Sequence, residues 1–306
     1  MNKIIYLFSL LPILMACSND NPGDVIFSAD VLNVRGTRYS KSDNSFEATY
    51  SNFIEALNAN QAISIIAEID HAANARAVGR VLNPTKTVFF ANPNLGFPLL
   101  QKNQLVGLDL PQKVLFFENN DALVFAMYNS VAYLESRYQL QDTTTLGQVS
   151  GALENLTTTA TNSGVQRAAN LIVEIGEGII TTESTQNFEQ TYSSLETAIS
   201  SDENLHVFAQ LDHQANASGV GMELRPTKVI IFGNTNLETP LMQNSQTTGL
   251  DLPQKMLVWE DQNGIVKISY NDPLYLQQRH GISGNDSQVQ QMVTILKELA
   301  NVAAGI

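Results

Sequence analysis

Cysteine is almost absent from this sequence, which holds one, Cys17, in 306 residues. A single thiol excludes disulfides within the chain and metal sites built from several cysteines. Positive charge is also scarce, because 17 Lys and Arg face 30 Asp and Glu and the formal net charge is −13. Binding to a nucleic-acid backbone requires clustered Lys and Arg that displace counterions. We therefore expect no nucleic-acid partner.

Long hydrophobic runs are missing as well. The apolar run of residues 4–14 is too short to span a bilayer and is typical of a signal-peptide core. It ends in Leu14-Met15-Ala16-Cys17, which resembles a bacterial lipobox, where the thiol is lipidated. We expect residues 1–17 to be a lipoprotein signal peptide that anchors Cys17 in the bacterial cell envelope, at the outer membrane, and residues 18–33 to be a polar tether. The alternative is a secretory peptide cleaved elsewhere, with Cys17 incidental.

What the sequence does contain is a tandem repeat. Residues 70–113 and 212–255 align without a gap at an offset of 142 residues, and 26 of their 44 positions are identical. This similarity indicates a duplication. A chain of 306 residues is also too long for one average domain. We expect a first repeat domain over residues 34–162 and a second over residues 163–306.

Hydrophobic periodicity predicts the order β-α-β-α-β-α-β-β-α in each copy. In the first copy the expected helices cover residues 45–58, 71–81, 95–101 and 133–138, and the expected strands cover residues 62–69, 87–90, 113–118 and 123–128, after a weak strand at 34–41. A further helix is predicted after each copy, over 143–159 and 288–302, and residues 165–175 fit either helix or strand. Helices that alternate with strands and a hairpin favour an α+β fold, one sheet backed by helices.

Six blocks of the second copy identify a family resemblance. They include Leu-Asp-His-x-Ala-Asn-Ala, Leu-Arg-Pro-Thr-Lys, Gly-Leu-Asp-Leu-Pro-Gln-Lys and Arg-His-Gly-Ile. These sequence blocks resemble the domain of unknown function 302 family. The resemblance implies an antiparallel sheet with helices, similar to the TATA-binding-protein class, and single domains that tend to pair; it implies no activity. Copy one has Phe117 for Trp259, Ser130 for Asp272 and Tyr138 for His280, so a site is expected in copy two.

His213 follows Asp212 at a predicted strand-to-helix junction. A carboxylate can orient an imidazole for proton transfer or metal binding. The alternative is that Asp212 only caps the helix and His213 is a first-turn residue. Asp251, His280 and Asn234 would add ligands of types that zinc accepts, but their spacing matches no local metal motif, and no metal site or cofactor is predicted.

Lys228 and Lys86 follow Pro-Thr at a strand start. A lone ammonium there could receive an anionic group near the capping amides of Asn236 or Asn94. A lysine extended along a sheet edge is the alternative. The complete set of candidate ligand-binding residues is His213, Lys228, Asn234, Asp251, Tyr270, Asn271 and His280 in copy two and His71, Lys86, Asn92 and Asp109 in copy one.

These observations favour a binding module over an enzyme. The sequence has no glycine-rich phosphate loop, nucleophile elbow or Cys-His pair. We expect a non-catalytic, lipid-anchored envelope protein that holds a small ligand, including an anionic one, or a partner protein. The alternative is a metal-assisted or His-dependent enzyme that uses His213, Asp251 and His280. A third possibility is a purely structural or assembly protein.

The duplication also predicts how the copies meet. If single-domain relatives pair, a gapless duplication reproduces that pair within one chain, with an approximate twofold axis. We therefore expect a side-by-side pseudo-dimer in which equivalent elements of residues 34–140 and 176–282 face each other.

Overall fold

The computed structural model describes residues 32–306. The predicted signal peptide, Cys17 and most of the tether lie outside the described residues. The first copy contains, in chain order, β1 (Thr37–Lys41), α1 (Phe46–Asn58), β2 (Ser64–Asp70), α2 (His71–Ala77), β3 (Thr85–Ala91), α3 (Pro93–Lys102), the 3₁₀ helix η1 (Gln104–Leu108), β4 (Gln112–Glu118), β5 (Val124–Asn129), α4 (Val131–Tyr138) and α5 (Thr143–Thr161).

The second copy repeats this order. After the short strand β6 (Gln166–Arg167) come β7 (Ile179–Glu183), α6 (Phe188–Ser200), β8 (His206–Asp212), α7 (His213–Ser218), β9 (Thr227–Gly233), α8 (Thr235–Asn244), the 3₁₀ helix η2 (Gln246–Leu250), β10 (Gln254–Glu260), β11 (Val266–Asn271), α9 (Pro273–Arg279) and α10 (Asp286–Ala304). The predicted order of strands and helices is confirmed in both copies.

Each copy forms one antiparallel sheet. The strand order is β2-β3-β4-β5-β1 in the first sheet, with β6 added at the edge beside β1, and β8-β9-β10-β11-β7 in the second. The registers agree as well: Lys86 lies opposite Phe116, and Lys228 lies opposite Val258 at the same offset of 142. The α+β fold with two antiparallel sheets is therefore confirmed. Because β6 pairs with β1, residues beyond the boundary expected at 162 extend the first sheet.

Two local predictions are corrected. The helix expected over residues 71–81 ends at Ala77, because Gly79 adopts a left-handed φ of 71° and the Arg80 N–H bonds to the Ala75 carbonyl. Asn92, and not Asn94, caps α3, since the Asn92 side chain accepts a hydrogen bond from the Asn94 N–H.

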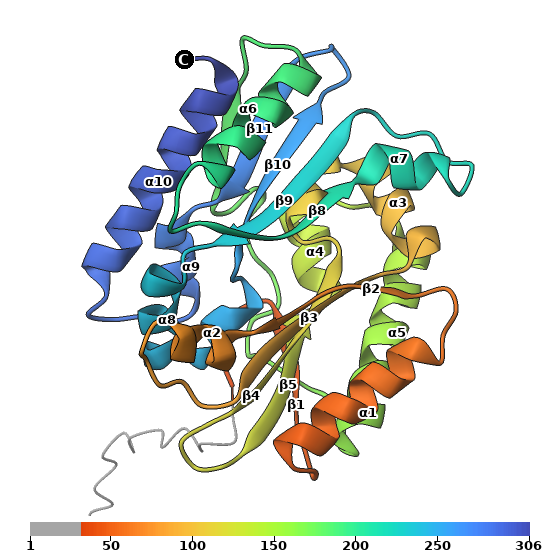
Figure 1. The fold of residues 1–306 in the computed structure, drawn as a ribbon. Coiled ribbons are helices and arrows are strands. Elements are labelled where there is room, and N and C mark those ends of the chain that lie inside the picture. Colours follow the sequence, from red (N-terminus) through yellow and green to blue (C-terminus); the bar gives the residue numbers. More distant parts are fainter. Residues whose placement is uncertain (1–31) are drawn as a thin grey trace, which may run out of the picture. The chain divides into compact units, whose positions relative to one another are not determined.

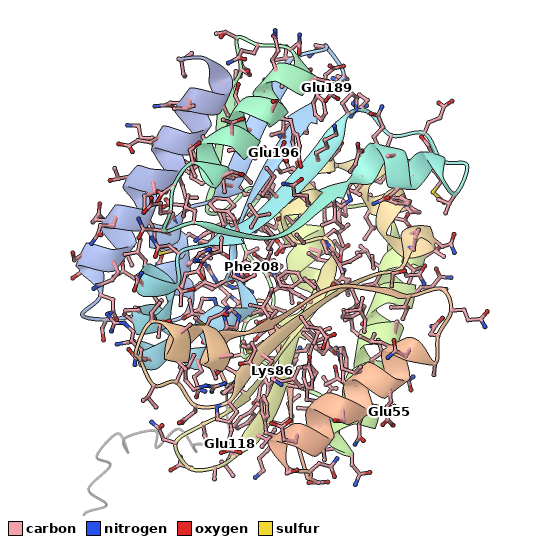
Figure 2. The ribbon with its side chains drawn as sticks, in the orientation of Figure 1. Glu55, Lys86, Glu118, Glu189, Glu196 and Phe208 are labelled. Carbon is pink, nitrogen blue, oxygen red and sulfur yellow. The ribbon has the colours of Figure 1, made fainter. Side chains whose placement is uncertain are left out.

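Helices cover one face of each sheet. In Figure 1, α1 and α5 lie against the first sheet, and α6 and α10 against the second. Phe53 of α1 and Leu153 of α5 pack in one apolar cluster with Val88 and Phe90 of β3. The opposite sides of these helices carry charge: Figure 2 shows Glu55 on α1 and Glu189 on α6, both exposed. The helical layer therefore buries one face of the sheet and leaves acidic side chains in solvent.

The other face of each sheet meets the other copy. Phe89, which lies between Val88 and Phe90 on β3, packs with Val229 and Ile231 of β9. Strands buried on both faces carry continuous apolar runs instead of alternating ones, as Val88-Phe89-Phe90 does here.

Equivalent polar contacts cross between the copies. Gln104 Nε2 donates to Thr227 Oγ1 at 2.8 Å, and Gln246 Nε2 donates to Thr85 Oγ1 at 2.9 Å. Both the donors and the acceptors are related by 142 residues. Contacts repeated in this way are those of an approximate twofold axis. The predicted pseudo-dimer is confirmed.

Glycine allows the copies to approach closely. A Cβ atom built on Gly107 would lie 2.7 Å from Leu257 Cδ1, and one on Gly249 would lie 3.0 Å from Leu115 Cδ1. The Gly-Leu-Asp-Leu-Pro block thus repeats because the same close contact is made from both sides.

Candidate functional site

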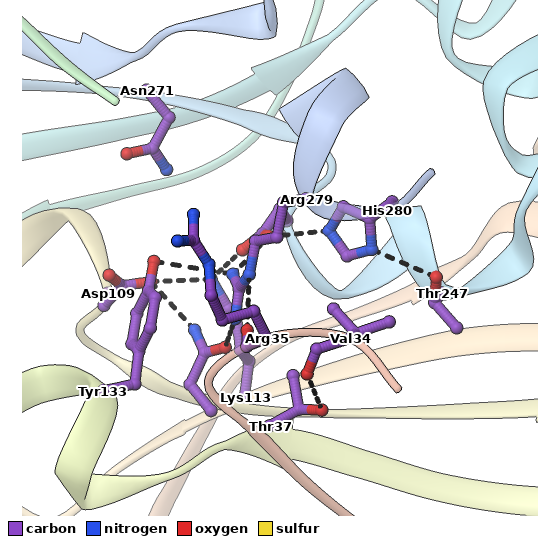
Figure 3. Close-up of polar contacts among 12 residues, drawn as sticks. Val34, Arg35, Thr37, Asp109, Lys113, Tyr133, Thr247, Asn271, Arg279 and His280 are labelled. Carbon is purple, nitrogen blue, oxygen red and sulfur yellow. Dashed lines mark hydrogen bonds and ion pairs between the residues drawn. The ribbon is translucent and has the colours of Figure 1, made fainter. Parts of the chain in front are cut away.

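Four predicted site residues meet in a buried polar cluster between the copies. They are Asp109, Asp251, Asn271 and His280, each at most 6% exposed. Figure 3 labels Asp109, Asn271 and His280. We call this set of side chains the ionic cluster. Its members are Asp109, Lys113, Asn129, Arg137 and Tyr138 from copy one and Asp251, Lys255, Asn271, Arg279 and His280 from copy two.

Two arginines span the ionic cluster symmetrically. Arg137 Nη1 lies 2.9 Å from Asp109 Oδ2, and Arg279 Nη1 lies 2.6 Å from Asp251 Oδ2. Each guanidinium also reaches the other copy, since Arg137 Nη2 donates to Asn271 Oδ1 at 3.0 Å and Arg279 Nη2 donates to Asn129 Oδ1 at 2.7 Å. Buried charges require paired and hydrogen-bonded surroundings of this kind.

The two cluster lysines are not equivalent. Lys113 Nζ bridges the carboxylates, 3.1 Å from Asp109 and 3.3 Å from Asp251. Burial opposes charge at Asp251, but the Arg279 guanidinium and the Lys113 ammonium hold its pKa well below the usual range. Burial and the neighbouring Lys113 lower the pKa of Lys255 well below its usual value. Burial also opposes charge at Lys113, but Asp109 and Asp251 raise its pKa, so the pKa values of the two lysines shift in opposite directions.

His280 serves as a hydrogen-bond partner within this interface. Its Nε2 lies 2.9 Å from Asp251 Oδ2 and its Nδ1 lies 3.0 Å from Thr247 Oγ1. Burial lowers the pKa of His280, although Asp251 opposes this shift. In copy one, Tyr138 donates to Asp109 Oδ2 at 2.6 Å from the equivalent position. The His-to-Tyr difference between the copies thus preserves a contact to the aspartate.

A cavity of about 430 Å³ lies elsewhere, at the edge of the interface. Its walls come from β2, β3, α3, the start of β4 and α5 of copy one, and from the end of β8 and α7 of copy two. Most of the lining side chains are apolar, and Phe90, Leu100 and Leu153 are examples. Of the predicted site residues, the structure places Asn92 and His213 in this lining.

His213 lines the cavity and has a ring nitrogen without a hydrogen-bond partner within residues 32–306. The residue is 4% exposed, and its Nε2 has no hydrogen-bond partner among the described residues. In copy one, His71 Nε2 lies 3.2 Å from Thr87 Oγ1, but Val229 replaces that threonine in copy two. Burial lowers the pKa of His213 to about 4 against the opposing effect of Asp212. The imidazole is therefore neutral at pH 7 and can donate or accept a hydrogen bond from a bound molecule.

Asp212 does not orient this imidazole by a hydrogen bond. Its carboxylate accepts the Ala215 N–H at 2.8 Å and thereby caps α7, and Asp70 caps α2 in the same way at 2.7 Å from the Ala73 nitrogen. Helix capping therefore explains why Asp precedes His in both copies.

The lysine candidates lie far from the asparagine candidates. Lys228 is the second residue of β9, and its Nζ lies 3.6 Å from Asp212 and 3.3 Å from Glu189. Lys86 pairs with Asp70 at 3.7 Å. The structure does not bring Lys228 near the amides capped by Asn234, because the full length of β9 separates them.

The remaining candidates are dispersed. Tyr270 packs between the second sheet and its helices, and no hydrogen bond or ion pair of the described residues joins His213 to Asp251 or His280. Within residues 32–306, no three His, Cys, Asp or Glu side chains are grouped so as to hold a metal ion.

Several residues of both sites were not predicted from the sequence. Arg137 and Arg279 occupy equivalent positions of the two copies, and this repetition could have identified them. Gln112 also lines the cavity, and its Nε2 has no hydrogen-bond partner in the described part of the chain. Gly96 in the cavity wall corresponds to Glu238, a difference within the most similar block. The sequence signal for the cavity was therefore a difference between the copies. The residues that the copies share indicated the interface instead.

The comparisons with known proteins agree with the duplication. The model of the family described as "Domain of unknown function DUF302" matches residues 38–156 and 180–299. A solved structure, the uncharacterised conserved protein DUF302 from Bacillus stearothermophilus, aligns over 42% of this chain and 98% of its own, with 17% identity and a TM-score of 0.38.

Curated relatives match over a shorter stretch. Proteins named "Fluoride-specific ion channel FluC 1" from Brucella suis biovar 1 (strain 1330) and Brucella abortus biovar 1 (strain 9-941) are each 39% identical over 132 residues. The match covers 43% of this chain and 52% and 48% of the two relatives, so the chain spans about half of their length. No helix in residues 32–306 combines the length and apolar character needed to cross a membrane.

Proposed function

The chain belongs to the DUF302 family, whose description assigns no activity, and we propose that it is a non-catalytic module that binds a small ligand in the cavity between its copies. The apolar cavity carries this proposal, together with two of its lining residues, His213 and Gln112, each of which has a buried side-chain nitrogen without a hydrogen-bond partner among the described residues. A buried polar atom without a hydrogen bond costs free energy, and a ligand atom would remove that cost. Small-molecule sites commonly measure about 300–1,000 Å³ and combine apolar walls with a few polar groups.

The ionic cluster is a less suitable ligand site than the cavity, which supports the choice of the cavity. Its carboxylates already bond to the Lys113 ammonium and to the two guanidinium groups at 2.6–3.3 Å. A ligand that entered would have to replace those contacts and would leave a buried charge unpaired. The cluster is better suited to hold the copies together.

We also propose that Cys17 anchors the protein by lipid to the bacterial cell envelope, at the outer membrane. This proposal depends on the lipobox-like sequence and on the polar tether after it. Metabolic labelling with an alkyne fatty acid tests it, together with partition into detergent. We expect both signals in the full chain and neither in Cys17→Ser; labelling of the variant would contradict the proposal.

Thermal-shift screening of metal-free protein against small molecules tests the binding function. Ala152, which lines the cavity from α5, offers a blocking variant, Ala152→Trp. Thr159→Trp adds the same side chain to an exposed position of α5 and is the matched control. We expect hits to stabilise the wild type and the control but not Ala152→Trp. Equal shifts in all three proteins would place binding elsewhere.

A His-dependent enzyme is the second candidate function. The neutral, unpaired imidazole of His213 in a cavity favours it, since such a group can move a proton. Turnover of any screened compound that is lost in His213→Ala would support this function over simple binding. Retained turnover in that variant would remove His213 from the mechanism. A metal-assisted version that uses Asp251 and His280 predicts zinc at about one per chain, lost in His280→Ala.

A further inference from the structure

Copy two contains a counterpart of the ligand cavity that is almost filled. The counterpart measures about 20 Å³, against about 430 Å³ for the cavity of copy one. Both are lined by residues at equivalent positions. The pairs are Ile63 and Leu205, Phe90 and Phe232, Ala91 and Gly233, Asn92 and Asn234, Leu95 and Leu237, and Gln112 and Gln254.

Glu238 fills the counterpart. It occupies the position of Gly96, is 3% exposed and directs its carboxyl group against Gly233. A Cβ atom on Gly233 would lie 2.5 Å from Glu238 Oε1, so the alanine found at the equivalent position 91 would require the Glu238 carboxyl group to shift. A Cβ atom on Gly96, in contrast, would meet no atom within 4 Å. The space taken by a glutamate side chain in copy two is therefore open in copy one.

The surroundings of that carboxyl group indicate what the open space can hold. Burial raises the pKa of the Glu238 carboxyl to about 8, the nearby backbone N–H groups of Gln254 and Asn234 oppose this shift, and Oε1 has no hydrogen-bond partner among the described residues. The equivalent backbone positions in copy one, Gln112 and Asn92, line the open cavity. Gln112 and His213, which also line the cavity, each have a side-chain Nε2 without a hydrogen-bond partner among the described residues.

We propose that the cavity of copy one binds a monocarboxylic acid with an apolar tail, whose carboxyl group takes the place that the Glu238 carboxyl takes in copy two. The inference rests on the proposed binding function and specifies its ligand class. The tail lies along the apolar side chains that α3 and α5 contribute, among them Leu95, Val149 and Leu153. A hydrogen-bonded head group and an apolar body are the combination that such a cavity recognises.

Calorimetric titration with decanoate, decylamine and decan-1-ol tests the head group. These probes share a ten-carbon chain and differ at one end. Decanoate should bind the wild type at one per chain and at least tenfold more tightly than the amine or the alcohol. Equal binding of decylamine or decanol would overturn the carboxyl assignment and leave the proposed function intact. Failure of all three probes, and of the wider screen, would remove both.

Substitutions at positions 96 and 238 test the place of binding. Gly96→Glu copies the plug into the open cavity and should weaken decanoate binding at least tenfold. Glu238→Gly removes the plug and should raise the stoichiometry from one to two, whereas Glu238→Gln keeps the space filled and should leave it at one. If Gly96→Glu does not fold, the double variant Ala91→Gly/Gly96→Glu reproduces the complete pair found in copy two. Undiminished binding in a folded plug variant, or decanoate elsewhere in a soaked crystal, would overturn the proposal.

Discussion

Arg279 connects three separate parts of the chain with one guanidinium group. It bonds to Asp251 within its own copy, and to Asn129 and the Arg35 carbonyl oxygen of the other, the last at 3.1 Å. Tyr133 of copy one adds an aromatic face 4.3 Å from the guanidinium carbon. Contacts of this kind make the residue necessary for the interface, because Asp251, Asn129 and Tyr133 are themselves buried.

Replacement of Arg279 by methionine should therefore destabilise the whole protein. The substitution leaves Asp251 buried without one of its cations, and removal of one partner from a buried ion pair costs about 3–5 kcal/mol. Urea denaturation of the variant measures this loss. Arg80→Met is the matched control, since Arg80 is exposed and should change the free energy of unfolding by less than about 0.5 kcal/mol. Similar values for both variants would contradict a structural role for the ionic cluster.

Glu238 should make stability depend on pH. Burial raises its pKa to about 8, against the opposing backbone N–H groups of Gln254 and Asn234. A carboxyl group whose folded pKa is raised binds its proton more tightly in the folded state, so its stabilising contribution is complete below the unfolded pKa and is lost as pH rises toward 8. Over the interval between the two pKa values, Glu238→Gln should lose less stability than the wild type, by a few kcal/mol.

Urea denaturation at pH 5, 6.5 and 8 measures this difference. The comparison isolates Glu238, because buried His71 and His213, whose pKa values are lowered to about 4, contribute equally to both proteins. Parallel pH profiles of the two proteins would show that Glu238 is ionised in the folded state.

At the scale of the element, the turn before β7 depends on two glycines with different requirements. Gly176 and Gly178 adopt φ values of 64° and 66°, which favour glycine. A Cβ atom on Gly176 would meet nothing within 4 Å, but one on Gly178 would lie 2.1 Å from the Tyr275 ring. The same backbone conformation is thus accompanied by open space at one position and by an aromatic ring at the other.

Alanine at these two positions separates backbone strain from steric overlap. Gly176→Ala should cost about 1–2 kcal/mol, the strain of a left-handed alanine. Gly178→Ala should cost at least about 1–3 kcal/mol more, since the ring of Tyr275 must also move. Thermal unfolding of both variants checks the order. Equal losses would mean that Tyr275 moves aside freely.

The elements themselves were largely predictable from the sequence, and the sites were not. Periodicity located the helices and strands because each helix has one buried face, as the residues of α1 show. The C-terminal end of α2 depends on a left-handed glycine, and the cap of α3 depends on one hydrogen bond. Hydrophobic periodicity specifies neither. Repetition identified Asp109, Asp251 and Asn271, but they form an interface, because a duplicated pair preserves the contacts made from both sides. The cavity was not predicted, since it depends on Gly96, where the copies differ.

At the scale of the molecule, the two copies share their core. Val229 and Ile231 of copy two pack with Phe89 of copy one, and Lys113 bridges the aspartates of both copies. Either copy alone would expose this apolar face and leave part of the ionic cluster unpaired. The copies should therefore unfold together.

Differential scanning calorimetry of the full chain tests this expectation. We expect one transition with equal calorimetric and van't Hoff enthalpies, the criterion of two-state unfolding. Arg279→Met should lower the midpoint of that one transition without splitting it. Two resolved transitions, or a calorimetric enthalpy well above the van't Hoff value, would show that each copy is stable independently.

The covalent connection between the copies has a genetic consequence. In a dimer of identical subunits, one codon specifies both halves, so a glutamate that plugged one cavity would plug the other as well. Here Gly96 and Glu238 are separate codons of a single gene, and each can mutate without the other. In the fused chain, one copy can therefore lose its cavity while the other copy retains its own, and the paired scaffold is preserved.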